Sequence, residues 1–339
     1  MGEHSVELNE ICLPIRGDLQ IMEVELKREL SAAKNAFILE INQHILNSSG
    51  KKLRPSLLLL SSRMGNHGHE KAIPVAVATE LVHTATLVHD DVLDRASIRR
   101  NRATLNTRWN NKTAVLAGDY LYFKAVSLVD ALEIPQILSM IASVTQEIWE
   151  GEVIQTERCY DPYLSEFDYL TIIRKKTASF MSACCQIGAT LARMSPEARK
   201  GLSNYGLNFG MAFQIIDDCL DLTASPDETG KSTYKDIEQG KMTLPLIYLV
   251  KRASKKDKQA LINLFERERQ EVIDLLARYE TIGLSLQRAK EYLIKAKDEL
   301  KVVEDSEAKD ALYQLGDYLL ERARAAAPAD VDSKVEMMI

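Results

Sequence analysis

The sequence predicts an all-α protein. Apolar residues recur at three- and four-residue spacing along nearly the whole 339-residue chain, and no run alternates apolar and polar residues as a strand would. The composition is that of an ordinary globular protein, with 46% hydrophobic and 27% charged residues. No short repeat and no low-complexity linker divides the chain, so we expect one large helical domain over residues 1–339.

The expected helices are separated by polar, glycine or proline breaks, such as Ser48–Gly50, Pro135 and Ser195-Pro196. One connection, TASPDETGKSTYKDIEQG, is long for a compact domain, and long internal loops are often functional. Residues 326–339 are expected to pack loosely. The expected helices cover residues 18–46, 52–64, 72–95, 113–132, 135–158, 166–194, 196–222, 241–252, 256–278, 283–302 and 306–326.

Charge and cysteine content narrow the class of protein. A net charge of -6 gives no general attraction to nucleic acid. The first residues lack the basic start and apolar run of a secretory signal, and the longest aliphatic stretch, Leu57–Leu60, is far below the roughly 20 residues that span a bilayer. We therefore expect a cytoplasmic protein with at most peripheral membrane contact. Five cysteines without CxxC spacing are expected to be reduced core residues: Cys12, Cys159, Cys184, Cys185 and Cys219.

Two aspartate clusters carry the strongest chemical signal. Asp90, Asp91 and Asp94 stand at i, i+1 and i+4, so Asp90 and Asp94 share one helix face. A single cluster of this kind is more often a solvated patch, but this chain has two, and each follows an apolar helical turn. Adjacent carboxylates near a core need a cation, and hard oxygen ligands at this spacing suit Mg²⁺. The second cluster consists of Asp217, Asp218 and Asp221.

Basic residues supply possible partners for an anion. The GKKLRP stretch places cations at the start of a helix, where backbone N–H groups also favour anions. Taken singly, each cation is more often part of a solvated face. Together with the acidic clusters, they favour a diphosphate held between magnesium and cations. The basic residues are Lys51, Lys52, Arg54, Arg99, Arg100, Lys175, Lys176, Lys231, Lys235 and Lys241.

Histidine offers a rival interpretation. His89-Asp90 is an HD doublet, typical of helical metal-dependent phosphohydrolases, and His67 and His69 form an HxH. All six histidines lie at or before residue 89, however, so the second acidic cluster has no imidazole nearby in sequence. His83 lies seven residues before Asp90 on the same helix face, which favours a ligand contact over a buried core role.

Seven motifs, in this order and spacing, resemble the trans-isoprenyl (polyprenyl) diphosphate synthase family. They are GKKLRP, ELVHTATLVHDDVLD followed by RR, AGDYL, GEVIQ, KKTASF, FQIIDDCLD and GKSTYKDIEQGKMTLP, and the resemblance is clearest in residues 45–250. It implies an isoprenoid synthase fold of long helices around a deep central cavity, usually in a homodimer.

The resemblance also implies the reaction. Three Mg²⁺ ions held by the aspartates help to draw the diphosphate off an allylic substrate. The double bond of isopentenyl diphosphate attacks the allylic cation, and loss of a proton gives an allylic diphosphate five carbons longer. Bound metal acts here on a leaving group and as a template.

The family roles carry over onto matching positions. The resemblance makes Asp90, Asp94 and Asp217 the chief magnesium ligands, supported by Asp91, Asp218 and Asp221. It assigns the allylic diphosphate to Arg99, Lys176, Lys231 and Lys241, and isopentenyl diphosphate to Lys51, Arg54, His83 and Arg100. Thr177 and Gln214 would present oxygen dipoles to the developing cation. The pairs Lys51/Lys52 and Lys175/Lys176 leave a one-residue ambiguity.

Four positions depart from the family pattern. Ser49, Asn101, Ala178 and Tyr234 stand where the family usually has glycine. Each must adopt backbone angles acceptable to a residue with a β-carbon, and Asn tolerates unusual angles best.

Product length is expected to depend on the residues below the first aspartates. Short-chain members of the family carry bulky aromatics where this chain has Ala85 and Thr86. Thr86 lies about one turn, roughly 5.4 Å, beneath Asp90. Small residues leave the shaft open and favour six or more isoprene units, about C30–C45, with octaprenyl as the specific expectation and a quinone side chain as its use. Phe123, Trp149 or Tyr122 could form a deeper floor.

Three alternatives remain. A geranylgeranyl or farnesyl diphosphate synthase would differ only in where the cavity ends. A terpene cyclase normally lacks a second aspartate cluster and the isopentenyl-binding residues. A non-catalytic partner subunit of a two-component synthase need not keep both clusters.

Overall fold

The chain folds almost entirely into helices, which confirms the all-α prediction. The structure is a computed structural model, and it describes residues 7–48, 50–65, 68–223, 234–261, 265 and 269–326. Outside the described residues lie Lys231, which was predicted to bind diphosphate, as well as Ser49 and residues 327–339. The α-helices are α1 (Leu8–Ile11), α2 (Arg16–Ser31), α3 (Ala36–Leu46), α4 (Leu53–Arg63), α5 (His69–Leu93), α6 (Leu105–Arg108), α7 (Asn111–Asp130), α8 (Pro135–Glu157), α9 (Glu166–Ile173), α10 (Ser179–Leu191), α11 (Pro196–Thr223), α13 (Lys235–Glu238), α14 (Leu244–Arg252), α15 (Lys255–Ala260), α16 (Arg269–Arg278), α17 (Thr281–Glu299) and α18 (Glu307–Ala326).

Several predicted helices are interrupted. The helix predicted over residues 18–46 divides into α2 and α3, because the Asn35 side chain caps α3 by accepting from the backbone N–H of Phe37 at 2.9 Å and of Ile38 at 3.2 Å. The segment predicted as 256–278 likewise contains both α15 and α16. Two 3₁₀ turns, η1 (Leu13–Ile15) and η4 (Leu300–Val302), precede α2 and follow α17.

A π-helical turn interrupts the helix predicted over residues 166–194. This turn, η2 (Arg174–Ala178), joins α9 to α10 and contains the KKT stretch. Single π-turns inside α-helices occur often at functional sites. Ala178 has an ordinary right-handed backbone, with φ -72° and ψ -35°, so a β-carbon there causes no backbone strain.

A short hairpin follows α5 and was not predicted. Strands β1 (Ile98–Arg99) and β2 (Arg102–Ala103) pair antiparallel. The two turn residues, Arg100 and Asn101, have φ values of 50° and 59°. A two-residue type I′ turn requires positive φ at both positions, and Asn is among the residues best suited to it. Asn101 therefore adopts the glycine-like backbone that the turn needs.

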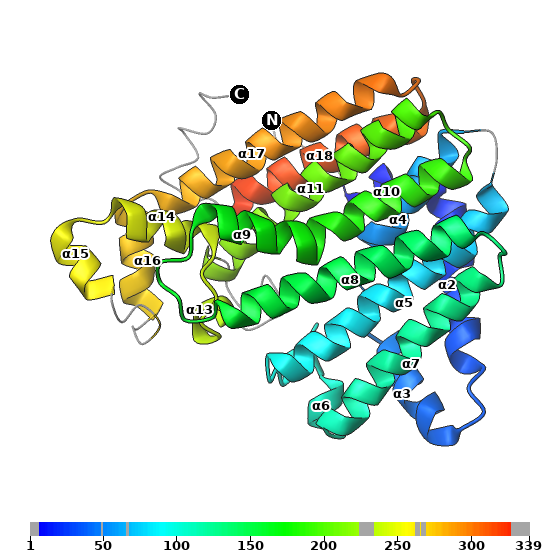
Figure 1. Cartoon of the computed structure of the whole chain (residues 1–339), viewed down its shortest axis with the longest axis horizontal. Helices are drawn as coiled ribbons and strands as arrows, with labels where there is room; N and C mark the ends of the chain where they lie inside the picture. The colour runs from blue at the N-terminus through cyan, green and yellow to red at the C-terminus, as the bar shows by residue number, and fades with distance from the viewer. Residues whose placement is uncertain are drawn as a thin grey trace.

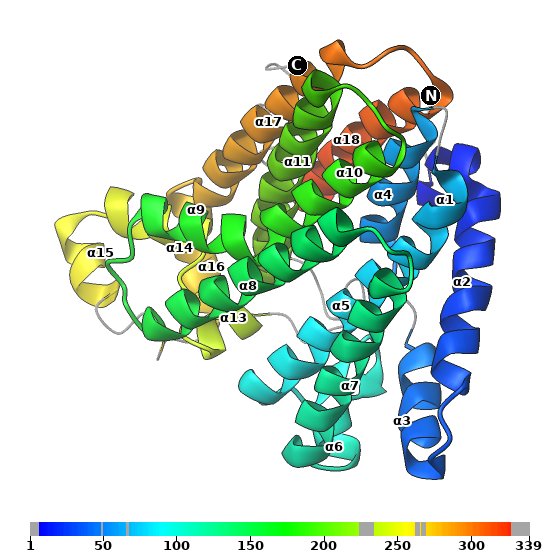
Figure 2. The same cartoon turned by 45° about the vertical axis from the view of Figure 1, so that its right-hand side comes forward.

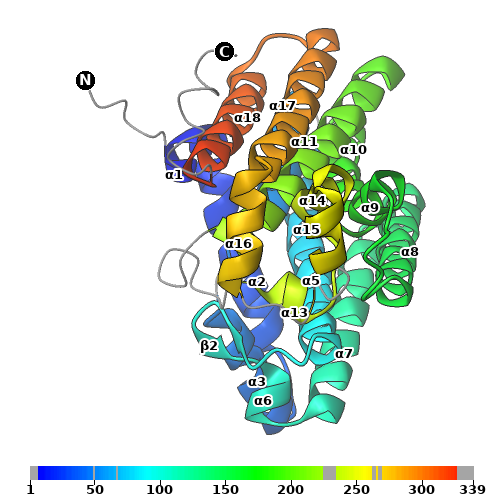
Figure 3. The ribbon, with the colours of Figure 1, turned by 90° about the vertical axis from the view of Figure 1, so that its left-hand side faces the viewer.

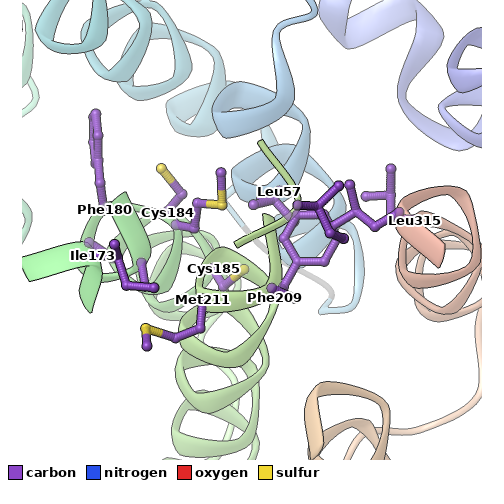
Figure 4. Close-up of a cluster of buried hydrophobic side chains, with 14 of the residues drawn as sticks. Leu57, Ile173, Phe180, Cys184, Cys185, Phe209, Met211 and Leu315 are labelled. Carbon is purple, nitrogen blue, oxygen red and sulfur yellow. The ribbon is translucent and has the colours of Figure 1, made fainter. Parts of the chain in front are cut away.

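The long helices pack around a shared hydrophobic core. In Figure 1, α8, α5 and α7 run diagonally below the layer formed by α17, α11 and α10. Figure 2 shows α2 and α3 along one side of this bundle. α10 packs on both α4 and α11, and α5 packs on α7. Figure 4 shows the core between these helices, with side chains from α4 (Leu57), α10 (Phe180), α11 (Phe209) and α18 (Leu315).

α5 is long and apolar enough to cross a membrane by length and composition alone. Yet 61% of its most apolar window is buried inside the protein, as expected of a core helix. Its C-terminal end carries the first aspartate cluster. α5 therefore positions that cluster from within the core.

Candidate active site

The first aspartate cluster lies at the C-terminal end of α5. Asp91 is buried, with 6% of its surface exposed, and accepts a hydrogen bond from Arg99 Nε at 2.6 Å. Asp94 caps the helix and accepts from Lys241 Nζ at 2.9 Å. Arg99 lies in strand β1, shortly after α5, and reaches Asp91 from there. Two of the three carboxylates are therefore already paired with basic residues assigned above to the allylic diphosphate.

Asp90 is the carboxylate of this cluster that is least compensated. Its pKa is raised from 3.8 to about 6, chiefly by burial; the charges of Glu152 and Asp94 also raise this pKa, while those of Lys176 and Arg99 lower it. A carboxylate whose ionised form is disfavoured in this way gains strongly from a nearby cation. The donor set thus fits a hard divalent ion such as Mg²⁺.

The second cluster, at the end of α11, has a different environment. The Asp217 side chain is 42% exposed, and Arg322 Nη2 of α18 lies 3.9 Å from its Oδ1. Asp218 is buried and accepts from Tyr169 Oη and from Gln214 Nε2, each at 2.7 Å. Burial raises the pKa of Asp218 well above its usual value, and the charge of Asp236 adds to the rise, while the two hydrogen bonds lower it. Neutral donors therefore hold Asp218.

Residues 234–241 connect the two clusters. Asp236 N donates to Asp221 Oδ2 at 3.3 Å, and Gln239 Nε2 donates to the Asp94 carbonyl at 3.3 Å. Burial raises the pKa of Asp236; the charges of Asp217 and Asp94 raise it further, although Lys241 opposes them. The segment therefore contacts an aspartate of each cluster. Figure 3 shows α13, which begins this segment, near α5.

Tyr234 begins this bridging segment with a left-handed backbone. Its φ is 72°, in the region that favours glycine, and its N–H donates to the Asp221 carbonyl at 2.9 Å. The ring is 5% exposed and packs with Arg269, whose guanidinium lies 5.7 Å from the ring centre. A residue with a large side chain thus adopts a left-handed backbone that favours glycine, the residue that the family usually has here.

A half-buried basic cluster surrounds His83 of α5. Arg54 Nη1 lies 3.2 Å from His83 Nε2, and Arg100 Nη1 donates to the Ser48 carbonyl at 2.9 Å. Burial lowers the pKa of His83 well below 6.5, and the charges of Arg54, Arg100 and Arg99 lower it further. His83 is therefore neutral, accepts from Arg54 through Nε2, and carries its proton on Nδ1.

This basic cluster contains a hydrogen-bond donor without a partner among the described residues. Among the described residues, none accepts a hydrogen bond from the buried Arg54 Nε. Gly50 packs directly on Arg100, since a β-carbon at residue 50 would stand 2.5 Å from its guanidinium. A buried guanidinium with an unmet donor favours an anionic ligand.

The structure separates the members of each ambiguous lysine pair. Lys51 Nζ donates to Tyr318 Oη of α18 at 3.0 Å and borders a cavity of about 850 Å³. Lys52 Nζ instead forms an ion pair of 2.8 Å with the buried Glu80. In the second pair, Lys175 pairs with Glu150 on the outer face. Its neighbour Lys176 instead contacts Glu152 and Gln155 of α8.

Lys176 is held by the GEVIQ motif of α8. Its ammonium forms an ion pair with Glu152 and donates to Gln155 Oε1. Gly151 permits this contact, because a β-carbon there would stand 2.8 Å from Lys176 Cγ. Among the neighbouring charges that lower the pKa of Asp90, that of Lys176 has the largest effect. Of its pair, Lys176 is thus the lysine near the first cluster.

The remaining predicted residues lie in two places. Thr177 Oγ1 donates to Gln214 Oε1 at 2.8 Å, so this pair comes together as the sequence suggested. Ala85 is buried in the main core, and Thr86 donates to the His83 carbonyl at 2.8 Å. That Ala85 and Thr86 line the space for a substrate tail remains a prediction.

Sequence reasoning missed several residues that contact the predicted set. Their partners are far away in sequence, so no local pattern indicates them, although GEVIQ gave a signal for two. These residues are Glu80, Glu152, Gln155, Tyr169, Asp236, Tyr318 and Arg322. Within the described residues, no group of three or more His, Cys, Asp or Glu side chains could by itself hold a metal ion.

The profile of the Polyprenyl synthetase family matches residues 35–282. The chain belongs to this family. It is a polyprenyl diphosphate synthase, a prenyltransferase that elongates trans-prenyl diphosphates, which confirms the resemblance found in the motifs.

Individual relatives differ in product length. The chain is 33% identical over 316 residues to octaprenyl diphosphate synthase of Escherichia coli, covering 88% of this chain and 98% of the relative. It is 34% identical over 313 residues to a short chain isoprenyl diphosphate synthase of Methanothermobacter thermautotrophicus, covering 89% and 96%. Overall similarity therefore does not determine the product.

The fold agrees with solved structures of the family. A polyprenyl synthase from Caulobacter crescentus, complexed with calcium and isoprenyl diphosphate, superimposes with a TM-score of 0.89 at 29% identity. The match covers 95% of this chain and 100% of that one. The isoprenoid synthase fold is thereby confirmed.

Proposed function

We propose that this polyprenyl diphosphate synthase makes a long all-trans product, about C30–C45 and specifically octaprenyl, by repeated addition of isopentenyl diphosphate to an allylic diphosphate. The observation that carries the length is the small, buried Ala85 on α5, five residues before Asp90. A growing tail that descends along α5 meets a methyl group there instead of an aromatic ring. Side-chain volume at such a position decides where a chain stops, because packed interiors leave no spare room.

The basic residues divide between the two substrates. Arg99 and Lys241 pair with carboxylates of the first cluster, and the charge of Lys176 lowers the pKa of Asp90. These three residues would bind the allylic diphosphate, together with Lys231. The half-buried pair Arg54 and His83, with Arg100 and Lys51, would bind isopentenyl diphosphate. The unmet Arg54 Nε supports this second assignment.

Asp90, Asp94 and Asp217 would hold three Mg²⁺ ions with the substrate. When bound, the metal supplies positive charge to the departing diphosphate. Lys176 and Lys241 add fixed positive charge beside it. The Thr177 and Gln214 oxygens would face the allylic carbon as positive charge develops, which is a preorganised electrostatic contribution.

A homodimer would use the exposed apolar face of α7 and α8. Leu116 and Phe123 of α7 are 58% and 65% exposed, and Val153 of α8 is 66% exposed. Leu116 and Phe123 are seven residues apart and share one helix face. Exposed apolar residues clustered on neighbouring helices are typical of an interface. Sedimentation velocity should give twice the monomer mass; a monomer would contradict this assembly.

The test of function is incubation of purified protein with labelled isopentenyl diphosphate, allylic primers and Mg²⁺, followed by chromatographic sizing. The wild type should give products of six or more isoprene units, and Ala85→Phe should give shorter ones at a comparable rate of incorporation. Ala85→Val serves as the control, because its smaller increase in volume should shorten the product least.

Each contrary result has a definite meaning. Products of unchanged length from a folded Ala85→Phe variant would overturn the role of Ala85. Wild-type products of only three or four isoprene units would favour a farnesyl or geranylgeranyl diphosphate synthase. No incorporation at all would favour the non-catalytic partner subunit.

A further inference from the structure

A hydrogen-bonded chain of four side chains links the second aspartate cluster to the π-helical turn. Tyr169 Oη of α9 donates to Asp218 Oδ2 at 2.7 Å, and Gln214 Nε2 donates to Asp218 Oδ1 at 2.7 Å. The other end of the same amide, Gln214 Oε1, accepts from Thr177 Oγ1 at 2.8 Å. The chain therefore runs from α9 through α11 to η2.

Burial makes this chain specific. Tyr169 is 3%, Asp218 5% and Thr177 7% exposed, so water does not compete freely for these polar groups. Both Asp218 oxygens are occupied by donors from the protein. Buried polar groups are costly when unpaired, so each partner in such a network constrains the others.

The carboxylate determines which way the Gln214 amide faces. Both Asp218 oxygens accept hydrogen bonds in the structure, so the carboxylate faces the amide nitrogen of Gln214. Rotating the amide by 180° would place Gln214 Oε1 against Asp218 Oδ1, two acceptors at hydrogen-bond distance. Gln214 therefore directs its oxygen toward Thr177, and the Thr177 hydroxyl directs its hydrogen toward Gln214. This leaves the Thr177 oxygen lone pairs free of that contact.

We propose that Asp218 and Tyr169 are positioning residues that fix the polarity of the Gln214–Thr177 pair, and that Asp218 does not act as a magnesium ligand. This inference rests on the proposed function, in which those two side chains present oxygen atoms to a developing allylic cation. Tyr169 fixes the position of the Asp218 carboxylate by a hydrogen bond to Oδ2. Asp218 then determines the orientation of the Gln214 amide, and that amide determines the direction of the Thr177 hydroxyl hydrogen. If Asn replaces Asp218, the donor and acceptor exchange in two hydrogen bonds: the one between residue 218 and Gln214, and the one between Gln214 and Thr177.

The first test separates polarity from metal binding. In Asp218→Asn, the new amide can keep its oxygen toward Tyr169 and donate from nitrogen to Gln214, which turns the Gln214 nitrogen toward Thr177. We expect kcat to fall about 10²-fold, comparable to the loss of one preorganised electrostatic group. The Mg²⁺ concentration for half-maximal rate should change less than twofold. The matched control is Asp217→Asn, which should raise that concentration at least tenfold.

The second test restores the polarity. In the double variant Asp218→Asn/Gln214→Glu, the Asn nitrogen donates to one Glu oxygen, and the other Glu oxygen again accepts from Thr177. We expect kcat to recover at least tenfold over Asp218→Asn, which a purely structural or metal-binding role does not predict. Tyr169→Phe, which removes one donor and little volume, should lower kcat about fivefold with KM for both substrates unchanged.

The outcomes are distinguishable. Undiminished kcat in a folded Asp218→Asn variant, or an Mg²⁺ requirement raised as in Asp217→Asn, would overturn the inference. So would a double variant no better than the single one. If instead the wild type shows no incorporation, the proposed function has failed. Circular dichroism and thermal melting establish folding, and Tyr169→Phe supplies the test if Asp218→Asn does not fold.

Discussion

The two aspartate clusters share one sequence pattern but have different partners. In the first cluster, the middle aspartate, Asp91, is bound by the Arg99 guanidinium. In the second, the middle aspartate, Asp218, is bound by a tyrosine hydroxyl and a glutamine amide. In both clusters the middle carboxylate is buried and turned toward a protein donor. The same motif thus places one residue in two different local networks.

The difference shows how the protein uses the middle carboxylate. Helical spacing puts the first and last aspartates of each cluster on one face and turns the middle one about 100° away. The partner of the middle aspartate depends on the neighbouring element. Asp91 is bound by Arg99 of the hairpin, whereas Asp218 is bound by residues of α9 and α11. We infer that Asp91 positions a diphosphate-binding cation and Asp218 positions a dipole.

The largest expected effect comes from the first aspartates. Asp90→Ala or Asp217→Ala should abolish condensation, a loss of at least about 10³-fold, because a bound metal contributes several kcal/mol to charge stabilisation. Incorporation of labelled isopentenyl diphosphate measures this, and circular dichroism should show that both variants remain folded. Undiminished turnover in either variant with Mg²⁺ present would remove the metal assignment.

A smaller effect should separate the middle aspartates. Asp91→Asn removes the charged partner of Arg99, a hydrogen bond worth about 1.5–3 kcal/mol, so we expect KM for the allylic diphosphate to rise about tenfold. KM for isopentenyl diphosphate should change little. Steady-state kinetics with each substrate varied in turn measures both. A fall in kcat alone, as expected for Asp218→Asn, would mean that the two middle aspartates do not differ as proposed.

The smallest effect concerns stability without metal. The folded protein holds the Asp90 proton with a pKa of about 6, against an unfolded value near 4. Below about pH 4 both states are protonated and there is no penalty; above about pH 6 both are ionised and the folded state carries the full penalty, at most about 3 kcal/mol. Asp90→Asn should therefore raise Tm above pH 6 and lose this advantage toward pH 4.

The matched variant for this stability test is Asp217→Asn. Its side chain is 42% exposed, so we expect a much smaller gain in Tm. Scanning calorimetry of metal-free protein between pH 4 and pH 8 measures both variants. Equal gains from the two substitutions would contradict the contrast between Asp90, whose pKa is raised by burial, and the half-exposed Asp217.

Local spacing predicted part of this site and long-range packing decided the rest. The shared face of Asp90 and Asp94 follows from helix periodicity alone. By contrast, Tyr169 meets Asp218 across 49 residues and Lys51 meets Tyr318 across 267, contacts that only tertiary packing creates. The hairpin was missed because its strands have two residues each, too few to show alternation.

The central claim is that the clusters bind metal through Asp90, Asp94 and Asp217 and use their middle aspartates, Asp91 and Asp218, for positioning. Calorimetric titration of Mg²⁺ into the protein with inorganic diphosphate tests this directly in Asp217→Asn and Asp218→Asn. Asp218→Asn should bind as many ions as the wild type, whereas Asp217→Asn should bind fewer. Loss of an ion from Asp218→Asn, with Asp217→Asn unchanged, would contradict the account.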